Sequence, residues 1–271
     1  MKVAIDFGIS NTDIAVLNNT GRHFYSFPSV KPLNFLSIKK IFTRLRIPIE
    51  KINVIGVTGG KSSGFDDYLG RIKVIKINEI EAIGIGAKKL YGIRDKSALV
   101  ISAGTGTACV HIHGNQFNHL GGIAVGGGML EGLGFLLFKN SHGPEINEFA
   151  LKGSRSELDL LIGDVLNKIG GLSPDVTAVN FGQAKNSSAD TMENTAAALC
   201  NMVGEVIGTV AYLNALLIGS DKAYFIGRTS YLTEVIRGIN GRLELAGIEG
   251  KFNNDREYGN VIGVLESIKN Y

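Results

Sequence analysis

The chain has 271 residues, enough to bury a large core as one large domain or two smaller ones. A hydrophobic share of 44% and a charged share of 20% exclude an intrinsically disordered protein. The formal net charge is +3 and the chain has no long run of basic residues, so the charge does not require a nucleic-acid partner. A mild positive charge suits an anionic small-molecule ligand equally well.

Glycine is present in large excess. The chain has 36 glycines and 5 prolines, which is about twice the usual glycine share of ~7%. The glycines cluster and do not recur at a collagen period. Such clusters indicate close approach of the backbone to a neighbour or ligand, or many tight turns.

Cysteine usage and the N-terminus predict a cytoplasmic protein. Cys109 and Cys200 lie far apart in apolar surroundings, which predicts buried thiols in a reducing compartment. Met1 leads directly into a strand-like run without a signal-peptide core.

The longest apolar region, residues 195–218, contains Asn201, Glu205 and Asn214. It therefore predicts a buried helix and not a membrane span, so no membrane partner is expected.

The N-terminal part predicts strands, then a helix and a further strand. Residues 2–27 have the pattern of two or three strands with a turn at 18–21. Apolar residues recur at helical spacing over 32–46, behind a proline start. Residues 52–60 predict a short buried strand that ends in two glycines.

Two hairpins share one pattern. Residues 79–90 predict a helix, and residues 97–114 predict a hairpin with the turn Gly104-Thr105-Gly106-Thr107. Like residues 3–17, this hairpin is an apolar strand, a turn of glycine and hydroxyls, and an apolar return strand. The repeat predicts two similarly built lobes with a boundary near residue 95, each giving one hairpin to a cleft. Coincidence is the alternative, because Gly-rich hairpins are common.

The second half predicts mainly helices. In chain order these are a glycine-led amphipathic helix over 121–138, helices at 156–169 and 190–217, a strand at 223–227, a helix over about 230–246, and a closing segment at 258–268.

Four glycine turns favour a nucleotide site. Backbone N–H groups bind phosphate where glycine lets them converge. Residues 104–107 and the triplet 126–128 have that character, and Asp6-Phe7-Gly8 and Gly59-Gly60 also follow strand-like runs. Four turns placed in this way would all point toward one cleft.

These motifs occur in a recognisable order. They are Asp6-Phe7-Gly8, Val57-Thr58-Gly59-Gly60, Ser102-Ala103-Gly104-Thr105-Gly106-Thr107, Gly121-Gly122 with Gly126-Gly127-Gly128, Asn180-Phe181-Gly182 and Phe225-Ile226-Gly227. In order and approximate spacing the whole chain resembles the type II (eukaryotic-like, Staphylococcus-type) pantothenate kinases, most closely over 98–137.

The resemblance implies an α/β fold of two ribonuclease H-like lobes with mixed sheets flanked by helices, as in the superfamily of acetate and sugar kinases, Hsp70 and actin. Residues 1–95 would form the N-terminal lobe, and residues 96–271 the C-terminal lobe with the dimer helix. The implied reaction is ATP-dependent phosphorylation of the primary hydroxyl of pantothenate, the first step toward coenzyme A. A homodimer is also implied.

The resemblance assigns a catalytic base. The family's glutamate opens a segment E-F-D-A-x-x-x-G, with which residues 79–86 align without a gap. A hydroxyl that attacks a γ-phosphate must lose its proton, and Glu79 would accept it. The alternative is that Glu79 is a first-turn acid favoured by the helix dipole.

The resemblance also implies the ligand sites. Asp6 would hold Mg²⁺, which prefers carboxylate oxygen, phosphate and retained water. The remaining ATP-binding residues would be Gly8, Ser10, Asn11, Gly104, Thr105, Gly106, Thr107, Gly126, Gly127, Gly128 and Gly227, and the acceptor-binding residues His119, Gly121 and Gly122.

The first hairpin departs from the family pattern D-x-G-G-T-x-x-K, whose lysine meets the ATP phosphates. Ile9 replaces the second glycine, Ser10 replaces the threonine, and Asp13 stands in the lysine position. A carboxylate beside a triphosphate repels it, at a cost of order several kcal/mol if unscreened. Three alternatives remain open. Mg²⁺ is bound at a different place, another cation takes the role of the lysine, or the site transfers phosphate from ATP inefficiently.

A second departure concerns the acceptor. The family has an arginine where this chain has Asn118-His119, and arginine can bind both oxygens of a carboxylate such as pantothenate's. His119 can make only one such bond. A kinase for another small acceptor therefore remains an alternative.

Two non-kinase functions also remain. A degenerate homologue that binds ATP without turnover would fit Asp13 and His119. An ATPase switch protein is disfavoured because no large appended domain is visible. Iron–sulfur activases of the superfamily need cysteines that bridge two subunits, a context that Cys109 and Cys200 lack.

Overall fold

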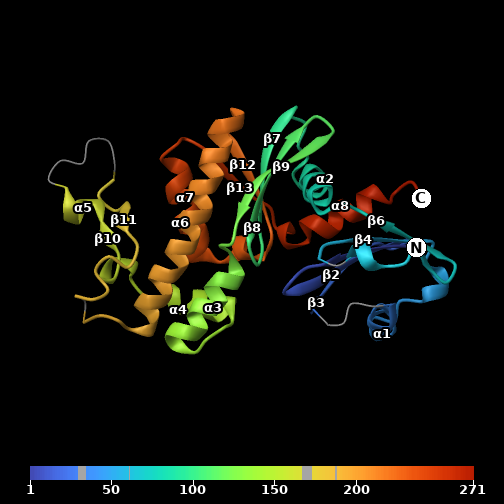
Figure 1. The fold of residues 1–271 in the computed structure, drawn as a ribbon, viewed down its shortest axis with the longest axis horizontal. Helices are drawn as coiled ribbons and strands as arrows, with labels where there is room; N and C mark the ends of the chain where they lie inside the picture. Colours follow the sequence, from blue (N-terminus) through green and yellow to red (C-terminus); the bar gives the residue numbers. More distant parts are fainter. Residues whose placement is uncertain (30–34, 61, 167–172, 187) are drawn as a thin grey trace. The chain divides into compact units, whose positions relative to one another are not determined.

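The computed structural model describes residues 1–29, 35–60, 62–166, 173–186 and 188–271. It divides into two compact units (Figure 1). Unit 1 comprises Met1–Lys96, Val110–His119 and Asn253–Tyr271, and unit 2 comprises Ser97–Cys109 and Leu120–Phe252.

Unit 1 contains a six-stranded mixed sheet in the order β3-β2-β1-β4-β6-β5. Its strands are β1 (Lys2–Phe7), β2 (Asn11–Asn18), β3 (Gly21–Pro28), β4 (Val54–Thr58), β5 (Tyr68–Leu69) and β6 (Ile72–Lys76). The strands β1, β4 and β6 are parallel, whereas β2 and β3 are antiparallel to their neighbours. The predicted strands at 2–27 and 52–60 are thus confirmed.

Helices cover both faces of this sheet because side chains alternate along each strand. On one face, Val3 and Ile5 pack in a cluster with Phe42 of α1 (Phe35–Arg44). On the other, Ala4 packs with Ala82 of α2 (Glu79–Tyr91) and with α8 (Gly259–Ser267). The predicted helices at 32–46 and 79–90 are present, although residues 32–34 lie outside the described part.

The helices α2 and α8 lie side by side in backbone contact (Figure 1). A Cβ on Gly86 would stand 1.9 Å from the carbonyl oxygen of Gly259, and a Cβ on Gly263 would stand 1.9 Å from that of Ala82. Part of the glycine excess therefore serves helix packing. This contact also explains why the C-terminal residues 253–271 cluster with unit 1, whereas the sequence division places them in the second lobe.

Residues 110–119, which carry the turn between β8 and β9, also cluster with unit 1. Lys88 Nζ of α2 donates to the carbonyl oxygen of Gly114 at 2.9 Å. A Cβ on Gly84 would stand 2.0 Å from the ring of Phe117, so this glycine admits the aromatic ring. Unit 1 is therefore discontinuous in sequence.

Unit 2 contains a two-stranded sheet of β10 and β11 and most of a five-stranded sheet in the order β13-β12-β7-β8-β9, of which the residues of β8 and β9 between 110 and 119 cluster with unit 1. The strands are β7 (Ser97–Ala103), β8 (Thr107–His113), β9 (Gln116–Ile123), β10 (Leu160–Leu161), β11 (Thr177–Val179), β12 (Lys222–Ile226) and β13 (Glu249–Phe252). The predicted hairpin at 97–114 and the predicted strand at 223–227 are confirmed.

The helices of unit 2 are α3 (Gly127–Phe138), α4 (Gly143–Ala150), α5 (Ile162–Val165), α6 (Met192–Ile218) and α7 (Thr233–Glu244). Short 3₁₀ turns occur in both units: η1 (Ile49–Lys51), η2 (Ser62–Gly64), η3 (Arg155–Glu157), η4 (Arg228–Tyr231) and η5 (Arg256–Tyr258).

The long helix α6 is a core helix of unit 2 (Figure 1). By length and composition it could cross a membrane, but 67% of its apolar window is buried within the protein. Its backbone meets α7 closely, since a Cβ on Gly204 would stand 2.2 Å from the carbonyl oxygen of Val235. The prediction of a buried helix at 190–217 is confirmed.

The predicted helix at 156–169 is wrong over its first half. The chain instead forms η3, the strand β10 and the single turn α5, and residues 167–169 lie outside the described part. The reason is tertiary: Asp159 is fully buried and accepts a hydrogen bond from the backbone N–H of Phe181 at 2.8 Å. The glycine-led helix also starts later than predicted, because residues 121–123 belong to β9.

Candidate functional site

The first hairpin of unit 1 presents two acidic side chains. Asp6 near the end of β1 is the direct partner of Asp13 in β2. The two residues are 8% and 5% exposed, respectively. Direct partners in an antiparallel pair lie on the same face, with Cβ atoms about 4.5–5.5 Å apart. The carboxylates therefore share one buried face of the sheet.

The turn of this hairpin is held by side-chain hydrogen bonds. Ser29 Oγ donates to the carbonyl oxygen of Gly8 at 2.6 Å. A Cβ on Gly8 would stand 2.7 Å from the carbonyl oxygen of Asn11, so this position is packed against the return strand. Ile9 and Ser10 are exposed. The predicted residues Gly8, Ser10 and Asn11 thus form one compact turn beside Asp6.

The turn after β4 explains the glycine at position 59. Gly59 has φ +79°, and a Cβ there would stand 2.5 Å from Asp6 Oδ1 and 2.8 Å from the carbonyl oxygen of Phe7. The backbone of this turn therefore approaches the carboxylate of Asp6 where no side chain fits.

Glu79 is the first residue of α2 and is exposed. Asn78 caps the helix by accepting a hydrogen bond from the backbone N–H of Ile80 at 2.9 Å. An acid in the first turn is favoured by the helix dipole, and Glu81 occupies that turn as well. The assignment of Glu79 as a base stays a prediction.

The second hairpin turn, in unit 2, is braced by the start of α3. The backbone N–H of Gly127 donates to the carbonyl oxygen of Gly104 at 2.8 Å, and that of Gly128 donates to the carbonyl oxygen of Thr105 at 2.9 Å. A Cβ on Gly126 would stand 2.7 Å from the same oxygen of Gly104. The triplet 126–128 therefore lets the helix start lie directly on the turn, with two of its N–H groups engaged there.

A third segment reaches the same turn. Gly227 has φ +93°, and a Cβ there would stand 2.4 Å from the carbonyl oxygen of Ala103. Thr229 Oγ1 donates to the carbonyl oxygen of Gly104 at 2.7 Å. Residues 104–107, 126–128 and 227 are thus brought together within unit 2. Thr229 is a bracing residue that a sequence pattern of glycines does not single out.

The three predicted acceptor residues lie in β9. His119 is exposed and clusters with unit 1, whereas Gly121 and Gly122 belong to unit 2. Gly121 has φ +123°, which favours glycine, and nothing lies within 4 Å of its Cβ position. Their role toward an acceptor stays a prediction.

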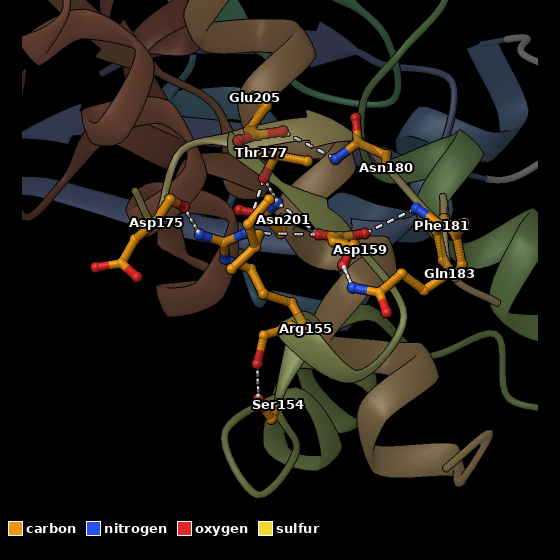
Figure 2. A network of polar contacts seen from close by, with 12 residues as sticks. Ser154, Arg155, Asp159, Asp175, Thr177, Asn180, Phe181, Gln183, Asn201 and Glu205 are labelled. Carbon is orange, nitrogen blue, oxygen red and sulfur yellow. Dashed lines mark hydrogen bonds and ion pairs between the residues drawn. The ribbon is translucent and has the colours of Figure 1, made fainter. Parts of the chain in front are cut away.

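Sequence reasoning did not predict the buried polar network shown in Figure 2. Its centre is Asp159, which accepts from the backbone N–H of Phe181 at 2.8 Å and from Asn201 Nδ2 at 3.2 Å. Arg155 lies 3.7 Å from the Asp159 carboxylate and donates to Thr177 Oγ1 at 2.7 Å. Burial raises the pKa of Asp159, against the opposing effects of the Phe181 N–H and Arg155.

A second carboxylate joins the network from α6. Glu205 accepts a hydrogen bond from Asn180 Nδ2 at 2.8 Å and lies 3.2 Å from a guanidinium nitrogen of Arg242. The motif Asn180-Phe181-Gly182 thus ties the β11 region to α6. The sequence did contain one signal for this network. Asn201 and Glu205 are polar residues four positions apart in an otherwise apolar helix, and buried polar residues need hydrogen-bond partners.

The described residues contain no group of three or more His, Cys, Asp or Glu side chains that could hold a metal ion. Both thiols are buried and unpaired, as predicted. Burial raises the pKa of Cys109 to about 11 and, with a smaller effect of Glu234, that of Cys200 to about 12.

Sequence comparison finds one family. The Fumble family matches residues 88–235. A type II pantothenate kinase of Bacillus cereus is 31% identical over 245 residues, which cover 84% of this chain and 83% of the relative. A type II pantothenate kinase of Oceanobacillus iheyensis is 28% identical over 233 residues, with 84% of each chain covered.

Solved structures share the fold. One is the activator of 2-hydroxyisocaproyl-CoA dehydratase from Clostridium difficile, with bound ADPNP, which has a TM-score of 0.65 at 14% identity. The alignment covers 100% of this chain and 97% of the activator chain. A ROK family glucokinase from Streptomyces griseus, in complex with glucose and AMPPNP, has a TM-score of 0.61 at 12% identity. The alignment covers 100% of this chain and 99% of the glucokinase chain. These likenesses confirm the predicted α/β fold, the actin-like ATPase fold with two ribonuclease H-like lobes.

Proposed function

This chain belongs to the Fumble family of type II pantothenate kinases, and we propose that it phosphorylates the primary hydroxyl of pantothenate with ATP, the first step of coenzyme A biosynthesis. The observation that carries the proposal is the sequence similarity to type II pantothenate kinases, which extends over 84% of the chain. The glycine turns of the first and second hairpins support it.

The residues present suit MgATP. Gly126 and Gly227 pack against the second hairpin turn so closely that neither position has room for a side chain. These two contacts hold the backbone of the turn in place. Residues 104–107 hold the β- and γ-phosphates in this proposal, and Gly227 borders the nucleoside. When bound, MgATP supplies the phosphoryl group.

Asp6 is the residue that would hold Mg²⁺. It offers a carboxylate on a buried strand face beside a turn without side chains. Carboxylate oxygens are the donors that Mg²⁺ prefers. The donor set therefore fits the cation.

Glu79 acts as the base in this proposal, and His119 with Gly121 and Gly122 positions the acceptor. The variant Glu79→Ala should lower kcat by about 10²–10⁴-fold while MgATP affinity stays nearly unchanged. Glu81→Ala is the matched control, because Glu81 lies exposed in the same helical turn. Equal turnover of the two variants would leave Glu79 as a first-turn acid only.

A kinase for another small acceptor is the second candidate, favoured by the exposed His119 at the position where the family resemblance expects arginine. A coupled assay of ATP consumption with and without pantothenate distinguishes the candidates. Pantothenate-dependent consumption supports the proposal. Consumption that is independent of pantothenate indicates an ATPase. ATP binding without consumption indicates either a kinase for another acceptor or a degenerate homologue, and ATP consumption that depends on another hydroxyl compound distinguishes these two.

The proposed enzyme is a cytoplasmic homodimer that contacts through unit 2. The end of α6 presents Leu213, Leu216 and Leu217 at 53%, 57% and 74% exposure. Exposed apolar side chains gathered at one helix end are typical of association surfaces. Light scattering on the wild type and on Leu217→Lys tests this: a monomeric wild type contradicts the dimer, and a dimeric variant contradicts this surface.

A further inference from the structure

A polar pocket in unit 2 shares no residue with the glycine turns. Its volume is about 240 Å³, and its walls include Ser154, Arg155, Ser156, Glu234 and Arg237. The first three residues lie in and around η3, and the last two lie in the first turns of α7. One water occupies about 30 Å³ of liquid volume, so the pocket has room for a small metabolite.

The inner wall carries a buried carboxylate with an unused acceptor. Glu234 is 7% exposed, and its Oε2 accepts from Arg237 Nη1 at 2.6 Å. Its Oε1 is buried and has no hydrogen-bond partner among the described residues. A buried acceptor without a donor is rare and costly in native proteins. The wall therefore lacks one donor.

The outer rim carries donors. The side chain of Arg237 is 68% exposed, and the hydrogen bond to Glu234 uses only one of its N–H groups. Ser154 and Ser156 add hydroxyls, whose oxygens lie 2.8 Å apart. The Arg237 end of this ion pair is exposed and the Glu234 end is buried, so a group that takes the place of Arg237 must also compensate the charge of the buried carboxylate. Glu234 thus places a carboxylate on the inner wall and Arg237 a cation at the rim, and the other charged side chains of the lining are Arg155 and Asp175.

We propose that this pocket binds a small zwitterion of the amino-acid class, with its ammonium group donating to Glu234 and its carboxylate accepting from Arg237. An ammonium group compensates a buried carboxylate better than a neutral donor does, because it brings the opposite charge. The guanidinium group at the rim then pairs with the carboxylate of the ligand instead of with Glu234. The proposal is independent of the kinase activity.

Isothermal titration of the full chain with glycine, 3-aminopropionate and 4-aminobutyrate tests the proposal. We expect saturable binding of at least one, and binding at least about tenfold weaker for propylamine and propionate, which carry one charge each. Glu234→Gln and Arg237→Gln should each weaken binding of that zwitterion by about tenfold or more. Glu244→Gln, at the exposed end of α7, is the control and should bind like the wild type.

Three results would overturn the proposal: no saturable binding of any of the three zwitterions, equal affinity of the wild type and Glu234→Gln, or propylamine binding as tightly as the best zwitterion. If Glu234→Gln shows no cooperative thermal transition, Arg237→Gln decides, because its exposed side chain is not needed for folding. Unchanged zwitterion affinity in that variant would also contradict the assignment.

Discussion

Replacing Gly126 by alanine tests whether the glycine triplet braces the second hairpin turn. The added Cβ would stand 2.7 Å from the carbonyl oxygen of Gly104 and 2.8 Å from that of Thr105. Gly126 itself has φ 170°, so the backbone conformation suits alanine and only the contact is unfavourable. Because both neighbours are backbone atoms, the turn or the helix start must move.

The expected cost is the overpacking penalty plus weakened hydrogen bonds. Overpacking against a rigid neighbour costs about 1–3 kcal/mol, and each of the two N–H bonds from Gly127 and Gly128 contributes about 1 kcal/mol. We therefore expect Gly126→Ala to lower the free energy of unfolding of unit 2 by about 1–5 kcal/mol, the upper end corresponding to loss of both hydrogen bonds. If this turn holds phosphates, MgATP affinity should fall as well.

Two variants of the same helix serve as controls. Nothing lies within 4 Å of a Cβ on Gly132, so Gly132→Ala should stabilise α3 by about 0.5–1 kcal/mol. A Cβ on Gly128 would stand 2.6 Å from the side-chain methyl group of Thr105, which can rotate, and 3.1 Å from the carbonyl oxygen of Thr105. Gly128→Ala should therefore cost less than Gly126→Ala, whose three nearest contacts are all backbone atoms. Urea unfolding and MgATP titration measure the series. If Gly126→Ala unfolds and binds MgATP like Gly132→Ala, the bracing argument fails.

Three further predictions concern buried groups. Neither Cys109 nor Cys200 should react with iodoacetamide at pH 8 in the native protein, because burial raises both thiol pKa values to about 11 and about 12; mass spectrometry showing native alkylation would contradict their burial. Burial also raises the pKa of Glu234 above its ordinary value of 4.5, so the folded state binds more protons than the unfolded state above that pH. The free energy of unfolding of the wild type should therefore fall relative to that of Glu234→Gln as pH rises from 4.5, and parallel urea curves would refute this. Asp13→Lys should tighten MgATP binding by about 1–3 kcal/mol if Asp13 faces the triphosphate, and a flat titration would refute that placement.

Local patterns predicted most of the fold because they depend on neighbours in sequence. The hairpin at 97–114 and the helix at 190–217 follow from periodicity and turn residues that a single sequence displays. The helix expected at 156–169 failed because Asp159 bonds to Phe181, a partner distant in sequence. Periodicity cannot reveal such a partner.

The candidate site was predictable by residue type but not by role. Glycines at 126–128 were expected to offer N–H groups to phosphate, yet those of Gly127 and Gly128 bond to the hairpin turn. Close backbone contact and phosphate binding both favour glycine, so a sequence cannot separate them. The distances to Cβ positions identify the glycines that face protein backbone, Gly126 and Gly227 among them.

The strand register changes what a substitution at position 13 can do. Because Asp13 pairs directly with Asp6, any side chain at this position emerges on the face that carries the Asp6 carboxylate. A lysine there can reach the triphosphate or pair with Asp6, and only the first adds a charge-assisted contact to the nucleotide.

Asp13→Asn separates the two effects, since it removes the negative charge and adds no cation. If repulsion by Asp13 limits MgATP affinity, the asparagine variant should bind MgATP more tightly than the wild type, and the lysine variant at least as tightly as the asparagine variant. A gain in Asp13→Lys alone shows a direct phosphate contact, whereas weaker binding in both variants means that Asp13 helps Asp6 to hold the cation.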